Sequence, residues 1–309
     1  MPAPVCASSG LLLLLAVLTP GTAQASPARI PDRSAPLSAA ASCVAAPTTL
    51  CLNNQRFKAE VQWKDFQGHT GSGQAIPLTS DTGYFWFFSS NNVELVVKVL
   101  DARAFNGRFW VFYGALSNVE YTLTVTDTTS GHVKSYTNPS GTFGSVGDTD
   151  AFSGSTTATA AASQTVQLRE TSRLGGMLEI PADLSGTALA AAPCPVEPTS
   201  LYLSGCRFRV SVSWKDFQGN TGQGQAVPLT SDTGYFWFFS SNNVELVVKV
   251  LDGRALNGRF WVFYGALSNV EYDITVTDTT IGQVTRYRNP AQRFGSAGDT
   301  QAFPPGTCP

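Results

Sequence analysis

Charged residues are scarce in this chain of 309 residues, and those present form no block of one sign. They make up 14% of the sequence, and 20 Lys and Arg stand against 22 Asp and Glu without a basic run. Nucleic-acid binding needs a basic patch or stripe, so we expect no nucleic-acid partner. Only two histidines occur, His69 and His132, and both lie in predicted turns, which indicates solvated residues rather than a general base.

Motifs of common catalytic and cofactor sites are missing as well. The sequence has no Gly-x-Ser-x-Gly elbow, no phosphate-binding glycine loop before a helix and no Cys-x-x-Cys pair. We therefore expect no enzymatic activity, no catalytic residue, no metal ion and no cofactor.

Long hydrophobic runs are also absent, since no stretch approaches the about 20 residues that a membrane-spanning helix needs. The apolar run Leu11–Leu18 ends at Pro20 and is followed by Ala23-Gln24-Ala25, a small-x-small cleavage site. We predict a signal peptide over residues 1–25, a secreted protein in the extracellular space or periplasm, and no membrane insertion. Residues 26–42 are rich in Ser, Ala and Pro, which favours a disordered stretch.

What the chain does contain is a tandem duplication. The hexapeptide Trp63–Gly68 returns at 214–219, an offset of 151 (214 minus 63), and Pro77–Asp101 is identical to Pro228–Asp252. The offset stays constant, so no insertion or deletion separates the copies, and each copy has about the size of one small domain.

Composition divides the chain into two modules and a connection. We predict the first module at 43–152 and the second at 194–309. Residues 153–193 are rich in Ser, Thr and Ala and contain Gly175-Gly176, which indicates a flexible linker. An edge strand at Gln164–Arg173 is an alternative for part of this segment.

Each module has the hydrophobic alternation of β-strands. Apolar and polar residues alternate along Phe57–Lys64, and Val93–Leu100 has one wholly apolar face, which predicts a half-buried strand. Asn106-Gly107 predicts a tight hairpin with positive φ at both positions, and Asp127–Gly131 predicts a turn. The sequence therefore predicts an all-β fold of two tandem antiparallel β-sandwich domains, with roughly seven strands each.

One segment resembles a known structural motif. In Leu116–Val125, and again in Leu267–Val276, a Leu stands five residues before a Tyr that enters a strand. This resembles the tyrosine corner of immunoglobulin-like and fibronectin type III β-sandwiches, which implies that the hydroxyls of Tyr121 and Tyr272 bond back to the backbone of the bend. The remainder resembles repeats of unassigned function in secreted bacterial multidomain proteins.

The cysteines indicate short disulfide loops. Without Cys6, which lies in the predicted signal peptide, five cysteines remain of the six. Export permits disulfides, and each module begins with a closely spaced pair. The predicted bonds are Cys43 with Cys51 and Cys194 with Cys206. Cys308 is left unpaired, or competes for Cys194 or Cys206.

Two acidic motifs suggest chemistry at first sight. Asp81-Thr82-Gly83 and its copy at Asp232 resemble the paired triplets of bilobal aspartic proteases, in which two carboxylates share a proton. Bulky Tyr84 follows where that family has a small residue, so we interpret both triplets as turns that begin a strand. The carboxylates at Gly147–Asp150 suit calcium, but the copy at Asp299 has lost one of them, which favours solvated turns.

The aromatic strings at Tyr84–Phe88 and Phe109–Tyr113 place large rings on both faces of their strands. Only one face can enter a single sandwich core, so the other is covered or forms an aromatic platform. Such a platform suits the apolar faces of sugar rings or the docking of a protein. We predict ligand-binding residues on these strands and their copies: Trp86, Trp110, Trp237 and Trp261.

The first functional hypothesis is thus a secreted, non-catalytic protein for adhesion or ligand recognition, with a glycan or a cell-surface protein as the partner. Two like sites on one tether increase avidity for a repetitive target. The alternatives are a purely structural spacer with no ligand and an aspartic-protease-like enzyme that uses Asp81 and Asp232.

Overall fold

The computed structural model describes residues 42–154 and 194–305, which form two all-β modules. The predicted signal peptide, almost all of the stretch at 26–42, the linker beyond residue 154 and Cys308 lie outside the described residues. The strands of the first module are β1 (Leu50–Leu52), β2 (Phe57–Lys64), β3 (Thr70–Ser72), β4 (Gln74–Pro77), β5 (Thr82–Trp86), β6 (Leu95–Ala102), β7 (Arg108–Ala115), β8 (Glu120–Asp127), β9 (Val133–Asn138) and β10 (Ser145–Ser153).

The second module repeats this order with nearly the same bounds. Its strands are β11 (Ser200–Leu203), β12 (Phe208–Lys215), β13 (Thr221–Gln223), β14 (Gln225–Pro228), β15 (Thr233–Trp237), β16 (Leu246–Gly253), β17 (Arg259–Ala266), β18 (Glu271–Asp278), β19 (Val284–Asn289) and β20 (Ser296–Phe303). Within the described residues, no helix is long and apolar enough to cross a bilayer.

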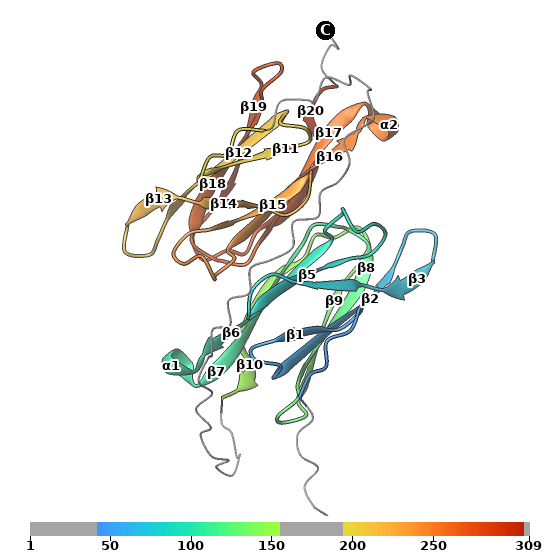
Figure 1. The fold of residues 1–309 in the computed structure, drawn as a ribbon, viewed down its shortest axis with the longest axis vertical. Coiled ribbons are helices and arrows are strands. Elements are labelled where there is room, and N and C mark those ends of the chain that lie inside the picture. The colour runs from blue at the N-terminus through green and yellow to red at the C-terminus, as the bar shows by residue number, and fades with distance from the viewer. Residues whose placement is uncertain (1–41, 155–193, 306–309) are drawn as a thin grey trace, which may run out of the picture. The chain divides into compact units, whose positions relative to one another are not determined.

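Each module is a sandwich of two antiparallel five-stranded sheets. In the first module, one sheet has the order β1-β2-β8-β9 with β3 paired to β2, and the other has the order β10-β7-β6-β5-β4 (Figure 1). The predicted all-β fold of two tandem antiparallel β-sandwiches is confirmed. The estimate of seven strands was too low, because β1, β3 and β4 are too short for their alternation to stand out in the sequence.

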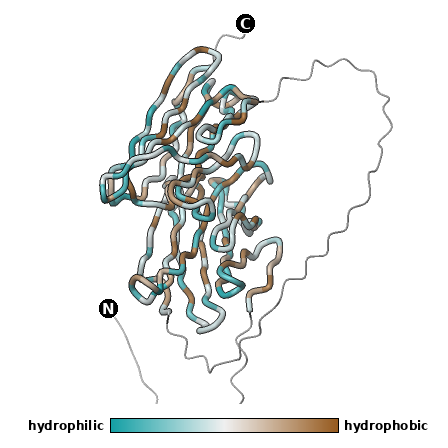
Figure 2. The backbone as a smooth tube through the Cα atoms, turned by 60° about the vertical axis from the view of Figure 1, so that its left-hand side comes forward, coloured by the Kyte–Doolittle hydropathy of each residue, from teal (hydrophilic) through white to brown (hydrophobic). Residues whose placement is uncertain are grey.

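The two sheets of a module enclose a core of alternating side chains. Phe57, Ala59 and Val61 of β2 are at most 1% exposed, whereas the residues between them are partly exposed. The same alternation appears as brown and teal along the strands in Figure 2. Each module has its own such cluster, and the second contains Phe208, Val210 and Val212 at the matching positions.

Two short disulfides lie at the module starts, as predicted. Cys43 bonds to Cys51 in β1, and Cys194 bonds to Cys206 between β11 and β12. Bonds of this kind form and persist in oxidising compartments.

The predicted Asn-Gly hairpin is wrong in detail. Between β6 and β7 lies one helical turn, α1 (Arg103–Asn106), and Gly107 ends it with φ 72° while Asn106 keeps a helical conformation. The second module has the same connection, α2 (Arg254–Asn257). Glycine is used here as the left-handed residue after a helical turn, and not as half of a two-residue turn.

The tyrosine corner is also wrong. Tyr121 is the second residue of β8 and is 1% exposed, but its hydroxyl has no hydrogen-bond partner among the described residues, and the same holds for Tyr272. The ring is held by packing instead, with its centroid 6.1 Å from that of Phe87 and 6.5 Å from that of Tyr113. Burial raises the pKa of Tyr121 well above its usual value, so the phenol stays neutral.

The prediction of a half-buried strand at Val93–Leu100 is wrong as well. Consecutive residues of β6 from Leu95 to Val99 are all buried, including Lys98 at 2% exposure. One face of β6 belongs to the core of its own sandwich, so a second layer must cover the other face.

Candidate functional site

The second layer over β6 is the other module. Both sandwiches belong to one compact unit, and a third apolar cluster contains residues of both. Its buried members come in identical pairs: Tyr84 and Tyr235, Val93 and Val244, Val96 and Val247, Phe112 and Phe263, Leu116 and Leu267. The outer face of the sheet that contains β5, β6 and β7 therefore covers the outer face of the sheet that contains β15, β16 and β17.

Equivalent positions meet in this interface. A Cβ on Gly114 would lie 2.9 Å from the backbone carbonyl carbon of Gly265, its own copy. The hydroxyls of Ser145 and Ser296, also copies of each other, are in hydrogen-bond contact. A contact between equivalent residues arises when a twofold axis passes between them, so the interface is isologous, as in a symmetric dimer.

A buried lysine from each module crosses the interface. The Lys98 Nζ donates hydrogen bonds to Asn243 Oδ1 at 2.8 Å, to the Val244 carbonyl at 3.0 Å and to the Leu267 carbonyl at 3.1 Å. In the reciprocal direction, the Lys249 Nζ donates to Asn92 Oδ1 at 2.8 Å and to the Val93 carbonyl at 2.8 Å.

A buried glutamate completes each of these sites. Glu245 is 1% exposed and accepts hydrogen bonds from the Asn243 amide and the Phe238 backbone N–H. Burial, only partly offset by the charge of Lys98, raises the pKa of Glu245 to about 7. Burial likewise lowers the pKa of Lys98 to about 8, against the charge of Glu245. Glu94 and Lys249 are shifted in the same directions to about 7 and about 8.

A cleft of about 500 Å³ opens beside this interface. Three phenylalanines at its rim are strongly exposed, namely Phe105 at 84%, Phe217 at 55% and Phe239 at 50%. Amide and hydroxyl side chains stand among the aromatic ones. The lining includes Leu100, Phe105, Trp110, Phe217, Gln218, Phe239, Ser268, Asn269 and Phe294.

The four predicted tryptophans are all half-buried and pack against the interface cluster. Of these, Trp110 lines the cleft, and its Nε1 donates a hydrogen bond of 3.0 Å to Asn106 Oδ1. Trp261 makes the matching bond of 2.8 Å to Asn257. The exposed phenylalanines and the Lys-Asn-Glu groups were not predicted, although a Lys and a Glu inside an apolar run signal an unusual strand.

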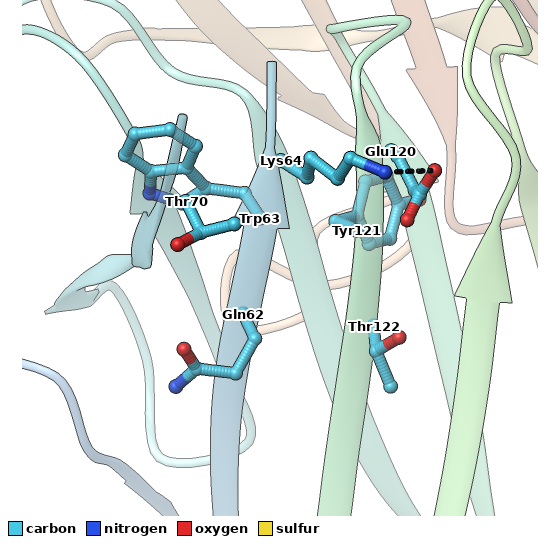
Figure 3. A pocket seen from close by; sticks show the side chains of 7 residues that line it. All are labelled: Gln62, Trp63, Lys64, Thr70, Glu120, Tyr121 and Thr122. Carbon is cyan, nitrogen blue, oxygen red and sulfur yellow. Dashed lines mark ion pairs between the residues drawn. The ribbon is translucent and has the colours of Figure 1, made fainter. Parts of the chain in front are cut away.

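A more polar pocket of about 330 Å³ lies between β2 and β8 (Figure 3), and a similar one lies in the second module. Its longer polar side chains already pair with one another or with a neighbour: Lys64 lies 3.9 Å from Glu120, and Gln62 donates to Ser72 Oγ at 3.0 Å. Trp63 and Tyr121 border the pocket, but both belong to the alternating core-facing set of their strands. We therefore place the candidate site in the cleft.

The acidic motifs lie in turns and strand pairs. Asp81 Oδ1 accepts hydrogen bonds from the Thr79 and Thr82 hydroxyls, and Asp232 does the same in its own module. Asp148 accepts from Tyr136 at 2.9 Å and from Lys134 at 3.2 Å.

The histidines lie on the surface. His69 pairs with Asp65 at 2.8 Å and is exposed, as is His132. Within residues 42–154 and 194–305, no group of three or more His, Cys, Asp or Glu side chains is arranged to hold a metal ion.

Comparisons with protein-family models, with curated proteins and with solved structures found no match to this chain. The fold defines the protein as two duplicated β-sandwiches whose aromatic faces are buried against each other.

Proposed function

We propose that this protein is a secreted, non-catalytic recognition protein and that the cleft beside Trp110 binds a neutral glycan. The observation that carries the proposal is the group of exposed rings at the cleft, since Phe105 is 84% and Phe217 is 55% exposed. Aromatic side chains on a soluble protein are seldom left this open unless they contact something, and a flat ring suits the apolar face of a sugar.

The charge around the cleft favours a neutral ligand. Lys98 and Glu245 line the cleft but are 2% and 1% exposed. The Lys98 Nζ is engaged by three acceptors, and the Glu245 carboxylate accepts from Asn243 and Phe238. Asp216 also borders the cleft, but its carboxylate accepts the backbone N–H groups of Gln218 and Asn220 at 2.9 and 2.8 Å. The groups left to a ligand are rings together with the amides and hydroxyls of the lining, which hydrogen-bond to uncharged sugar hydroxyls.

Binding of neutral oligosaccharides, followed by glycan array and then by calorimetry, tests this function. We expect affinity in the wild type that changes little with salt, because no charged pair forms. Trp110→Ala should lose most of it, and Trp261→Ala is the matched control, since the second module has Leu256 at the position of Phe105. No binding by the wild type, or undiminished binding by Trp110→Ala, contradicts the proposal.

A structural spacer is the second candidate, and one observation favours it. Tyr84 and Phe112, which the aromatic strings offered as part of a platform, are only 8% and 6% exposed because the other module covers them. Under this proposal the rings fasten the duplicate modules together. We propose a likeness to immunoglobulin-like and fibronectin type III domains in the sandwich architecture only.

A further inference from the structure

The same three side-chain types meet twice in the interface, and each time the lysine comes from the opposite module. Lys98 contacts Asn243, whose amide contacts Glu245. Lys249 contacts Asn92, whose amide contacts Glu94. We propose that each lysine forms an isopeptide bond to the asparagine it contacts, so that the folded chain links its two modules covalently without an added enzyme.

The reacting atoms are already close. The Lys98 Nζ lies 2.8 Å from Asn243 Oδ1, and a carbonyl bond is about 1.23 Å long, so the Asn243 Cγ is within about 4 Å of the amine. Lys249 is placed identically, 2.8 Å from Asn92 Oδ1. Holding two groups near contact in one geometry removes most of the entropic barrier to their reaction.

Water has little access to the amine and the carboxyl group, although both line the cleft and Asn243 is partly exposed. Lys98 is 2% and Glu245 is 1% exposed, and the ring of Phe112 lies 5.1 Å from the Lys98 Nζ. Water would otherwise compete with the amine for the amide carbon and would stabilise the unreactive ammonium.

The protonation states suit a nucleophilic attack. Burial lowers the pKa of Lys98 to about 8 and raises that of Glu245 to about 7, so the neutral amine and the protonated carboxyl group are both accessible near neutral pH. The neutral amine is the nucleophile, and a carboxyl group with a pKa near 7 can both give and take a proton.

The reaction is a balanced exchange of one amide for another. The Lys98 Nζ attacks the Asn243 Cγ, and the Nζ–Cγ bond forms. The protonated Glu245, whose Oε1 is hydrogen-bonded to Asn243 Nδ2, gives its proton to that nitrogen. The Cγ–Nδ2 bond then breaks, and the departing ammonia takes the surplus proton from Nζ and leaves as ammonium, with Glu245 left as a carboxylate. Nothing is oxidised or reduced, and Glu245 regains its proton from solvent.

Intact mass spectrometry of the purified full chain tests the proposal. We expect a mass lower by one ammonia for each bond, and peptide mapping should identify Lys98 joined to Asn243 and Lys249 joined to Asn92. Loss of one ammonia, mapped to either pair, supports the bond at that pair. A chain of full mass overturns the proposal and leaves the lysines as hydrogen-bonded ammonium groups.

A second measurement is independent of mass. A protease site inserted between residues 155 and 193 allows the full chain to be cut between the modules. After cleavage, a reducing and denaturing gel should show one band if the modules are linked and two bands if they are not. Both described disulfides lie within a module, and the reductant removes any other.

Variants identify the role of each residue. The double variant Glu94→Gln with Glu245→Gln keeps the shape of both sites but removes the proton carriers, so we expect two bands and full mass. Arg103→Met, at an exposed ion pair on α1, is the control and should leave one band. Melting temperatures show that each variant is folded, and a linked double variant contradicts the glutamate's part in the reaction.

Discussion

Ser145 and Ser296 hold the same place in the two repeats, and their hydroxyl groups contact each other. Two equivalent residues touch only near a twofold axis, so each module presents to the other the surface that it receives in return. The string Pro77–Asp101, which is identical in both copies, supplies much of this surface. Because the copies are identical over this string, equal surfaces meet across the axis and the interface is complementary to itself.

The close approach of Gly114 to Gly265 predicts a sensitive position. Gly114→Val places a Cβ 2.9 Å from the Gly265 backbone, where no flexible side chain can yield, so we expect the modules to separate. Sedimentation velocity should show a more extended monomer, and the bonds between lysine and asparagine should not form. Ser135→Val on the exposed side of β9 is the control and should behave as the wild type. A compact Gly114→Val monomer contradicts the interface.

Arg56 and Asp127 form a second testable pair, inside the first module. The Asp127 side chain is 1% exposed and accepts from Arg56 Nε at 3.1 Å and Nη2 at 2.8 Å. Arg56→Met leaves a buried carboxylate without its cation, which we expect to lower the unfolding free energy by about 3 kcal/mol. The exposed pair of Arg103 and Asp101 is the matched control, and Arg103→Met should cost less than about 1 kcal/mol in denaturant unfolding. Equal losses of unfolding free energy in Arg56→Met and Arg103→Met would falsify the role of Arg56 as the partner of a buried carboxylate.

Much of each sandwich was predictable because its signals are local. Along Phe57–Lys64 the apolar residues recur at every second position, which specifies the buried face, and β2 has those bounds. The disulfides followed from cysteines close in sequence. The connection at Asn106-Gly107 was predicted less well, because a left-handed glycine serves a helical turn as readily as a hairpin.

The interface was not predictable in the same way. The alternation of Val93–Leu100 marks one face as core but cannot show that the face with Glu94 and Lys98 is covered by a copy of itself. Asn243 becomes a partner of Lys98 only when the modules dock, and no spacing in the sequence encodes that contact. Trp110 was predicted from the aromatic string Phe109–Tyr113, whereas the exposure of Phe105 and Phe217 depended on the fold of α1 and of the turn after β12.

The buried glutamates predict an unusual pH dependence of stability. The pKa of Glu94 and Glu245 rises from 4.5 to about 7 in the folded state, chiefly through burial. The folded protein therefore binds these protons more tightly than the unfolded chain, so the contribution is full below pH 4.5 and is lost as the pH rises through about 7. Denaturant unfolding should show stability falling over this window. The double variant Glu94→Gln with Glu245→Gln should flatten the slope, and an unchanged slope would contradict the assignment.

A tyrosine corner implies that the hydroxyl of Tyr121 is hydrogen-bonded, whereas this hydroxyl has no partner among the described residues. Removing a buried hydroxyl that has no partner among the described residues relieves a desolvation cost, so Tyr121→Phe should leave the unfolding free energy unchanged or raise it. Tyr136→Phe is the matched comparison, because the Tyr136 hydroxyl donates to Asp148 Oδ2 at 2.9 Å, and its loss should cost about 1.5 kcal/mol. Urea unfolding of the two variants separates the cases. A larger loss in Tyr121→Phe than in Tyr136→Phe would show that the hydroxyl of Tyr121 has a stabilising partner after all.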